Sequence, residues 1–175
     1  AFFNCESLSQ IEILSCVTFI GDFAFYGCKN LKQIELSSSV TKIGNCAFKE
    51  CQSLEKVLFS SLIESIPIGM FERCESLEEI EIPSSVKSIE DHAFRYCKSL
   101  EKIILPSSLI IIKQFAFCNC KSLKEIKIPS TVEFIGHHVF YLCQSLKEIK
   151  IPSSVKSIEK YSFARCTSLE TIIIP

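Results

Sequence analysis

The sequence of 175 residues is poor in the residue types that many enzymes and cofactor sites need. It contains no Trp, one Met and five Gly, and its only aspartates are Asp22 and Asp91. It has no glycine-rich phosphate loop, no nucleophile elbow and no metal-binding helix motif. It also lacks an Asn-x-Ser/Thr sequon, so we expect no N-linked sugar. We therefore predict that the chain is not an enzyme and has no catalytic residues.

Charge and hydropathy argue against three further classes of protein. Nineteen Lys and Arg against twenty Asp and Glu leave a net charge of −1, which does not indicate nucleic acid as a partner. No apolar run approaches the roughly 20 residues of a transmembrane helix, so we expect no transmembrane segment. An apolar fraction of 47% also excludes a disordered chain.

One pattern repeats along the chain without insertion or deletion. Eight Cys residues lie 23 residues apart, and each has Phe three residues before it and Leu three residues after it. These cysteines are Cys5, Cys28, Cys51, Cys74, Cys97, Cys120, Cys143 and Cys166. With Leu as position 1, the seven full units are 8–30, 31–53, 54–76, 77–99, 100–122, 123–145 and 146–168, flanked by partial units 1–7 and 169–175. No linker interrupts this stacked-repeat pattern, so we expect one domain over residues 1–175.

The pattern inside a unit predicts one short strand and one tight turn. Apolar residues at positions 4 and 6 alternate with polar ones, as in a strand with one face toward the core. Pro follows at position 7 five times, as in Pro83 and Pro175, and ends the strand because it lacks an amide donor; Leu14, Ser37 and Ser60 replace it elsewhere. Ser at positions 8 and 9 predicts a turn. Apolar residues at positions 13, 17, 18 and 21 then follow a three-to-four spacing, which predicts a helical or 3₁₀ turn.

A unit of this kind should be stable only when stacked. Its apolar side chains do no more than offset the conformational entropy lost when 23 residues are ordered. Neighbouring units shield each other's open faces, so the array becomes stable as a whole. We predict a solenoid in which every coil adds one parallel strand.

The 23-residue pattern resembles the BspA-like group of leucine-rich repeats. Residues 77–97, LEEIEIPSSVKSIEDHAFRYC, show it most clearly. The resemblance implies an α/β repeat solenoid, namely a right-handed leucine-rich-repeat array with a parallel sheet on the concave side and short turns or 3₁₀ segments on the convex side. It also implies a surface protein of bacteria or protists that adheres to host or matrix proteins. The Gly common after the position-13 Ile is kept only as Gly21, Gly44 and Gly136, which puts local turn geometry in question but not the fold.

We interpret the cysteine column as a ladder of small core residues, and two alternatives stay open. Coils about 4.8 Å apart fall within the Cα distance of a disulfide, but side chains in register point the same way and eleven cysteines cannot all pair. A zinc site would need a second ligand pair that Cys118 and Cys120 lack. We predict no metal and no cofactor. Cys16, Cys46 and Cys118 lie off the column, and we expect them to be exposed.

The three histidines do not indicate a site either. His92, His137 and His138 fall at positions 15 and 16, on the segment that connects one expected strand to the next. We expect them to be solvated turn residues.

The positions that vary between units predict the functional surface. Positions 3 and 5 should point outward and line the concave sheet. The candidate protein-binding residues are Glu12, Glu35, Leu58, Glu79, Glu81, Lys102, Ile104, Lys127, Lys150 and Ile173. Residues 54–99 carry nine acidic and five basic side chains, whereas residues 100–168 carry five acidic and ten basic ones. Apolar Leu58 and Ile104 among these charges favour a protein-docking face, with an ordinary solvated surface as the alternative.

These patterns and the resemblance together predict a non-catalytic protein-interaction scaffold. We expect an adhesive cell-surface or extracellular protein that binds a host or matrix protein ligand through the concave sheet. The alternative is a cytoplasmic leucine-rich-repeat adaptor or regulator, because eleven thiols would stay reduced there. The chain begins at Ala1 without a signal-peptide pattern, so we expect a fragment of a longer protein. Leu8, Ile11, Ile172 and Ile174 would expose core at uncapped ends, which further repeats, a cap or a second copy joined end to end could cover.

Overall fold

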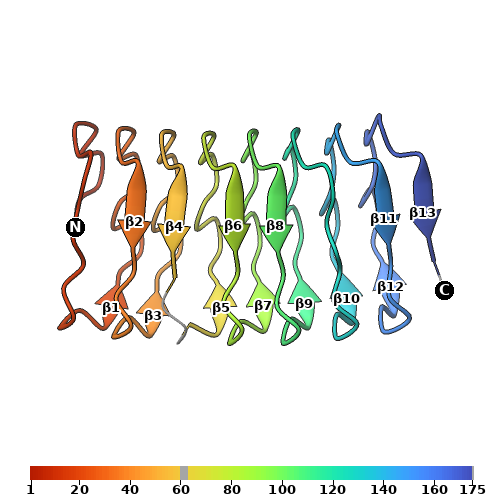
Figure 1. The fold of residues 1–175 in the computed structure, drawn as a ribbon, viewed down its shortest axis with the longest axis horizontal. Coiled ribbons are helices and arrows are strands. Elements are labelled where there is room, and N and C mark those ends of the chain that lie inside the picture. The colour runs from red at the N-terminus through yellow and green to blue at the C-terminus, as the bar shows by residue number, and fades with distance from the viewer. Residues whose placement is uncertain (60–62, 175) are drawn as a thin grey trace.

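Each coil of the chain contributes short strands that pair only with the equivalent strands of neighbouring coils. A computed structural model describes residues 1–59 and 63–174. It shows a parallel β-solenoid of about seven turns, with the N- and C-termini at opposite ends of the stack (Figure 1). Ser60 and Pro175, two of the position-7 residues discussed above, lie outside the described residues.

The first strand column is the one that the sequence predicts. Its strands are β2 (Gln33–Glu35), β4 (Lys56–Leu58), β6 (Glu79–Glu81), β8 (Lys102–Ile104), β11 (Glu148–Lys150) and β13 (Thr171–Ile173). Pairing is parallel and offset by 23 residues, as in Ile34 with Val57 of β2 and β4. In β2, β4, β6, β8 and β11 the middle residue is buried and its two neighbours are exposed. The period-2 pattern at positions 3 to 5 is therefore confirmed as a strand with one face in the core.

A second strand column was not predicted, so the expectation of one strand per coil is wrong. Its strands are β1 (Phe19–Ile20), β3 (Lys42–Ile43), β5 (Ser65–Ile66), β7 (Ser88–Ile89), β9 (Ile111–Ile112), β10 (Phe134–Ile135) and β12 (Ser157–Ile158). The last five of these form a continuous sheet in the order β12-β10-β9-β7-β5. Each strand has two residues, which is too short to show a period-2 pattern in the sequence. The invariant Ile at position 13 is its second residue.

The segment after this second column is a turn, and the predicted helical or 3₁₀ element is not confirmed. Residues 1–59 and 63–174 contain no helix, so the α/β description does not apply to them. Each coil places two residues, at positions 16 and 20, in the left-handed region with φ between 53° and 69°. Such residues prevent a right-handed helix from continuing. Amide groups here donate to the next coil instead, as Phe25 does to the Ala47 carbonyl oxygen at 2.8 Å.

The hydroxyl groups at position 9 also join coils, rather than closing a turn within their own coil. Ser85 Oγ donates to the Ile63 carbonyl oxygen at 2.6 Å, and Thr131 Oγ1 does the same to Leu109. The equivalent bonds of Ser39, Ser108 and Ser154 measure 2.6 to 2.7 Å.

The right-handedness of the coil and the concave shape of the sheet remain predictions.

The core is a set of side-chain columns that run the length of the stack. The Phe column at position 18 forms a stack in which ring centroids of adjacent coils lie 5.2 to 5.8 Å apart. Its members are fully buried from Phe48 to Phe140, whereas Phe2 at the N-terminal end is 39% exposed. Aromatic pairs of this kind add to the free energy gained from burial. Each coil is therefore stabilised by the two beside it.

The effect of removing one ring should depend on its place in the stack. Phe94→Ala should lower the free energy of unfolding by about 3–5 kcal/mol, because it opens a cavity between two packed rings. Phe2→Ala should lower it by much less, because this ring packs against only one neighbour, Phe25. Urea unfolding followed by circular dichroism measures both values. Equal losses at the two positions would contradict stabilisation by nearest neighbours.

Candidate functional site

The candidate residues lie together on one surface of the solenoid. We call this surface the strand face and define it as the outward residues at positions 3 and 5 of the first strand column. All ten predicted residues are on it and are exposed. Eight belong to β2, β4, β6, β8, β11 or β13, while Glu12 and Lys127 occupy the same positions in coils that have no strand there.

Two hollows divide the strand face. The N-terminal hollow has a volume of about 590 Å³ and is lined by residues that include Glu12, Glu35 and Leu58. The C-terminal hollow has a volume of about 780 Å³, and its lining includes Ile104, Lys127 and Lys150. The structure thus gathers seven of the candidate residues into two groups, because Lys102 also lines the C-terminal hollow. The candidate residues of the first hollow are acidic or aliphatic and those of the second are basic or aliphatic, although Lys56 also lines the first hollow and Glu125 and Glu148 line the second.

The C-terminal hollow coincides with an interruption of the sheet. Between β8 and β11 the coil at residues 123–128 joins the ladder only through a bridge between Lys102 and Glu125. The coil without an arrow between β8 and β11 marks this place in Figure 1. Lys102 and Glu125 both line the hollow, so the depression lies at one of the places where the first strand column is interrupted; the column is also interrupted between β4 and β6.

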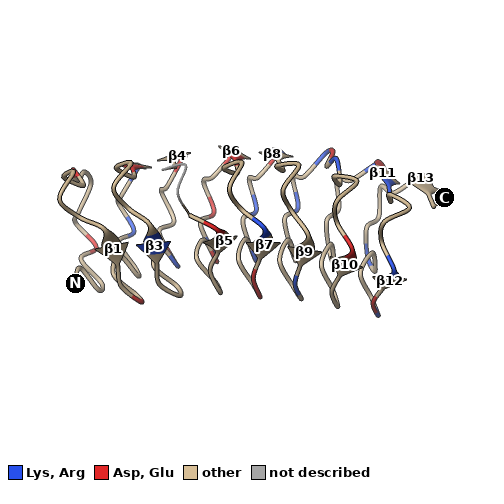
Figure 2. Cartoon of the chain, turned by 90° about the horizontal axis from the view of Figure 1, so that it is seen from below, with Lys and Arg blue, Asp and Glu red and all other residues tan. Residues whose placement is uncertain are grey.

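The remaining candidate residues lie between or beyond the hollows. Glu79 and Glu81 belong to β6 and pair in register with Lys102 and Ile104 of β8. Neither acidic residue lines either hollow. Ile173 of β13 is 42% exposed near the C-terminal end of the stack. The face therefore has acidic residues at its centre. In Figure 2 the strands of the first column run along the upper edge, and blue segments appear among the red ones there from the coil after β8 to β11.

Ion pairs connect equivalent positions of adjacent coils, but mostly away from the strand face. Lys or Arg pairs with an acidic residue exactly one unit away in nine places, such as Lys98 with Glu75 at 2.8 Å. Only Lys102 with Glu79, at 2.7 Å, lies on the strand face. The hydrogen bond that Lys102 donates to Glu79, together with the charge of Glu79, raises the pKa of Lys102.

Most charges on the strand face have no ion partner. Ten of its residues are charged. Apart from Lys102 and Glu79, none of them lies within 4.0 Å of an opposite charge in the described part of the chain. Lys127 and Lys150 are one coil apart, as are Glu12 and Glu35, so like charges occupy neighbouring places. Like charges across a pair of strands are destabilising, which means that folding does not explain these side chains.

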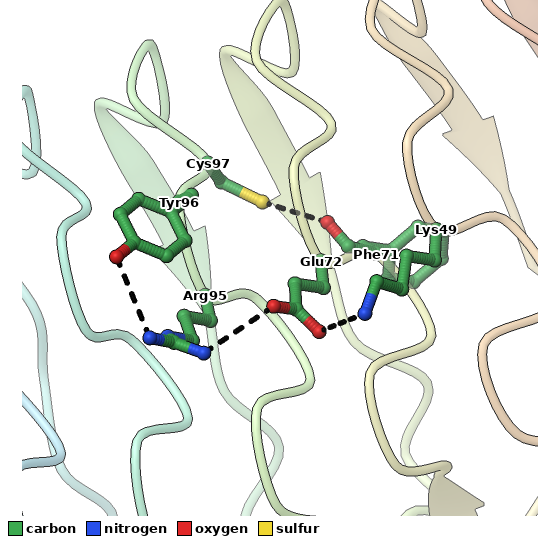
Figure 3. Close-up of polar contacts among 6 residues, drawn as sticks. All are labelled: Lys49, Phe71, Glu72, Arg95, Tyr96 and Cys97. Carbon is green, nitrogen blue, oxygen red and sulfur yellow. Dashed lines mark hydrogen bonds and ion pairs between the residues drawn. The ribbon is translucent and has the colours of Figure 1, made fainter. Parts of the chain in front are cut away.

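The cysteine column is chemically closed. Each Sγ from Cys28 to Cys166 donates to the carbonyl oxygen of the Phe in the preceding coil at 3.0 to 3.2 Å. Figure 3 shows this bond between Cys97 and Phe71. Burial raises the pKa of Cys51 to about 12 and that of Cys166 to about 11. These thiols therefore stay protonated and are poor nucleophiles at neutral pH.

The eleven cysteines are all free, and one prediction about them is wrong. Cys16 is exposed and Cys46 half-buried, but Cys118 is buried, and this burial raises its pKa. Cys118 lies at position 19 of its unit. Arg95, which pairs with Glu72, packs near it. Among the described residues, no group of three or more His, Cys, Asp or Glu side chains is placed to hold a metal ion.

Two of the three histidines are also less solvated than expected. His92 and His138 stack on the two faces of Phe115, with centroid distances of 5.0 and 4.7 Å, whereas His137 is exposed. Burial lowers the pKa of His92, and the charge of Arg95 lowers it further. The position-16 column is therefore an aromatic ladder rather than a set of free turn residues.

The sequence analysis missed a buried carboxylate in the turn region. Glu72 lies between Lys49 and Arg95 of the adjacent coils, at 2.9 and 3.5 Å, and its side chain is only 9% exposed (Figure 3). Burial lowers the pKa of Lys49, but its hydrogen bond to Glu72 and the negative charge of Glu72 and other nearby groups together outweigh this effect, so the pKa of Lys49 is raised. Arg95 also lies over the Tyr96 ring, 4.7 Å from its centroid. The alternation of Lys, Glu and Arg at position 19 of three successive units was the signal that could have revealed it.

The chain is similar to known repeat proteins in both sequence and structure. The family model described as "BspA type Leucine rich repeat region (6 copies)" matches residues 1–109 and 87–175. None of the curated proteins matches the chain. No helix in the described residues is long and apolar enough to cross a membrane.

Three crystal structures of bacterial repeat proteins are similar to the chain. A leucine-rich repeat protein from Eubacterium ventriosum is 32% identical with a TM-score of 0.71, over 77% of this chain and 37% of that one. A leucine rich cell surface protein from Faecalibacterium prausnitzii is 30% identical with a TM-score of 0.52, over 90% and 29%. The T. pallidum leucine rich repeat protein is 31% identical with a TM-score of 0.64, over 95% and 66%. The chain thus spans little more than a third of the first of these proteins and less than a third of the second.

Removing the charge of Glu72 should destabilise the fold. Glu72→Gln would leave Lys49 and Arg95 facing each other across a neutral amide. We therefore expect a loss of about 1–2 kcal/mol in the free energy of unfolding. This loss is smaller than for a fully buried ion pair, because Lys49 and Arg95 are both partly exposed. Urea unfolding measures it. Glu75→Gln is the matched control, because its pair with Lys98 is more exposed and should change stability by at most about 0.5 kcal/mol. Equal effects would show that burial of Glu72 is not important.

Alkaline pH should destabilise the fold through the buried thiols. A thiol in the unfolded chain titrates near its usual pKa of about 8.5, whereas Cys51 in the folded chain titrates at about 12. As the pH rises above about 8.5, the unfolded chain therefore loses protons first. The contribution of these thiols to the free energy of unfolding should be constant below that pH. Above it, the contribution of each such thiol should fall by about 1.4 kcal/mol per pH unit. Urea unfolding in reducing buffer at several pH values tests this, and Cys51→Ala should give a shallower decline than the wild type.

Proposed function

The chain belongs to the BspA-type leucine-rich repeat family, and on this basis we propose that it is a non-catalytic protein-interaction scaffold whose strand face binds a protein ligand. The observation that carries the proposal is the set of strand-face charges that have no ion partner within the described residues. Elsewhere in the described chain fifteen of the 29 charged side chains pair along the stack, as Lys156 does with Glu133, against two of the ten on the strand face. Charges kept without such pairing are available to a partner.

The chemistry of the face suits a protein better than a small molecule. Both hollows are broad depressions across three coils, and each combines charged residues with exposed aliphatic side chains, namely Leu14 and Leu58 in the first and Ile104 in the second. An aliphatic residue of the partner could fill a hollow while its charged residues meet the rim. Complementary charges of this kind mainly set the association rate and the choice of partner.

A place on the cell surface, with a role in adhesion to a host or matrix protein, is part of the same proposal. It is supported by the F. prausnitzii relative, which is described as a cell surface protein. The rigid stack would hold the strand face at a fixed orientation, because every coil is bonded to its neighbours through strands, turns and side-chain columns.

A cytoplasmic adaptor is the second candidate, and the eleven free thiols favour it. The thiols from Cys51 to Cys143 in the column are buried, so only residues such as Cys5 and Cys16 are exposed to oxidation. Treatment with oxidised glutathione separates the two settings. A chain that remains monomeric and keeps its ligand binding is suited to the cell surface, whereas loss of binding would favour the cytoplasm.

Ligand binding should depend on the C-terminal hollow. In surface plasmon resonance against a panel of purified extracellular-matrix and host proteins, we expect Ile104→Ser together with Lys127→Ala to raise the Kd of any bound protein at least about tenfold, because an aliphatic contact and a charge are lost at the centre of the contact. Lys156→Ala is the matched control, since this exposed lysine lies off the strand face. Equal loss in the control, or no binding by the wild type, would count against the proposed function.

A further inference from the structure

The outward residues at position 5 form a row whose charge pattern is inverted when it is read backwards. From the first to the seventh coil the row consists of Glu12, Glu35, Leu58, Glu81, Ile104, Lys127 and Lys150. Two acidic residues and an aliphatic one precede the centre, and an aliphatic residue and two lysines follow it. These seven residues are therefore complementary to the same seven of a second copy in the opposite direction, and Ile173, the eighth residue of the row, would extend beyond the first full coil of the other copy.

A two-fold axis parallel to the strands would place two such rows face to face. If the axis passes over Glu81, the first coil of one copy lies opposite the seventh coil of the other. Glu12 then faces Lys150 and Glu35 faces Lys127, while Leu58 faces Ile104. Each of these contacts occurs twice, because a two-fold interface uses the same surface on both copies.

The shape of the strand face follows the same symmetry. The N-terminal hollow spans the first three coils, and the C-terminal hollow spans the fifth to the seventh. The axis over Glu81 therefore brings the N-terminal hollow of each copy opposite the C-terminal hollow of the other. Glu12, Glu35, Lys127 and Lys150, which lack ion partners within the described part of one chain, would acquire partners between chains.

The other charges of the face give a more moderate match. At position 3, Gln10 and Gln33 face Glu148 and Glu125, to which their amide groups can donate hydrogen bonds. At the centre, like charges face each other across the axis: Glu79 and Glu81 each lie opposite the same residue of the other copy, and Lys56 lies opposite Lys102. Within each copy Lys102 neutralises Glu79 at 2.7 Å, which lessens this repulsion.

The interface would also be small. Seven coils at about 4.8 Å spacing and a strand width of about five residues give roughly 500 Å² per partner, which is below the approximately 800 Å² of a standard stable complex. We therefore expect a weak dimer that depends on salt and on protein concentration.

We propose that the strand face binds a second copy of this chain in an antiparallel, face-to-face dimer centred on Glu81. The inference rests on the proposed function, because it assigns a partner to the same face. The residues that determine it are Glu35 and Lys127, which lie in opposite hollows and have no ion partner in the described chain. Reversing either charge should leave the fold intact, since no intramolecular ion pair is lost.

Charge reversal with sedimentation velocity tests the dimer. At low salt, over about 10–500 µM protein, the wild type should form a dimer in a concentration-dependent manner. E35K and K127E should each raise the dimer Kd at least about tenfold, because each places like charges opposite each other twice. An equimolar mixture of the two variants should restore nearly the wild-type Kd, since both contacts in the mixed dimer then join opposite charges. The off-face variants E64K and K87E, which reverse the members of an exposed ion pair, should not change the Kd.

The outcomes separate this inference from the proposed function. A wild-type chain that stays monomeric throughout, a dimer unaffected by E35K and K127E, or a mixture that shows no rescue would each overturn the antiparallel dimer. If the monomeric chain still bound a matrix protein through Ile104 and Lys127, only the dimer would be lost. If it bound no protein at all, the proposed function would fail as well.

Discussion

The bonding of each coil to the next, at a fixed spacing of 23 residues, is the constraint on which the rest of this structure depends. Strands pair in parallel register, turn amides donate to the following coil, and each column cysteine donates to a Phe carbonyl oxygen of the coil before it. All of these contacts are made only if equivalent residues stay level with each other. A single insertion would break several columns at once, which explains why the period never varies.

This constraint also divides the residues into two kinds. Inward positions are fixed by the neighbours above and below, so they vary little, from the Phe stack to the thiol column. Outward positions are free to vary, and about half of the charges outside the strand face pair along the stack, as Lys113 does with Glu90. On the strand face the charges remain largely unpaired in the described chain, which is the observation behind the proposed function.

Much of the architecture could be predicted from the sequence because the columns are visible as exact repeats. The exposed strand column and the buried Phe and Cys ladders follow from residue type and spacing alone. The second strand column could not be predicted, because two residues such as Ser88 and Ile89 carry no periodic signal.

The left-handed turns could not be predicted for a different reason. Glu50, Arg73 and Tyr96 have positive φ angles although their side chains do not favour them. Burial of Glu72 was missed because a charged residue in a turn is normally solvated, and only the neighbouring coils supply its two cations. The candidate residues were placed on one face correctly, but their grouping into two hollows arises from three-dimensional spacing that no single unit encodes.

Identical contacts between successive coils also bear on how such a chain can change over evolutionary time. Loss or duplication of one whole unit rejoins a position to its own equivalent, so every backbone bond and every core column re-forms without a new turn being invented. The outward rows do not share this tolerance, because removing one coil brings different charges next to each other and shifts the centre of the acid-to-base gradient. Recombination in steps of 23 residues would thus preserve the scaffold while rewriting what it recognises.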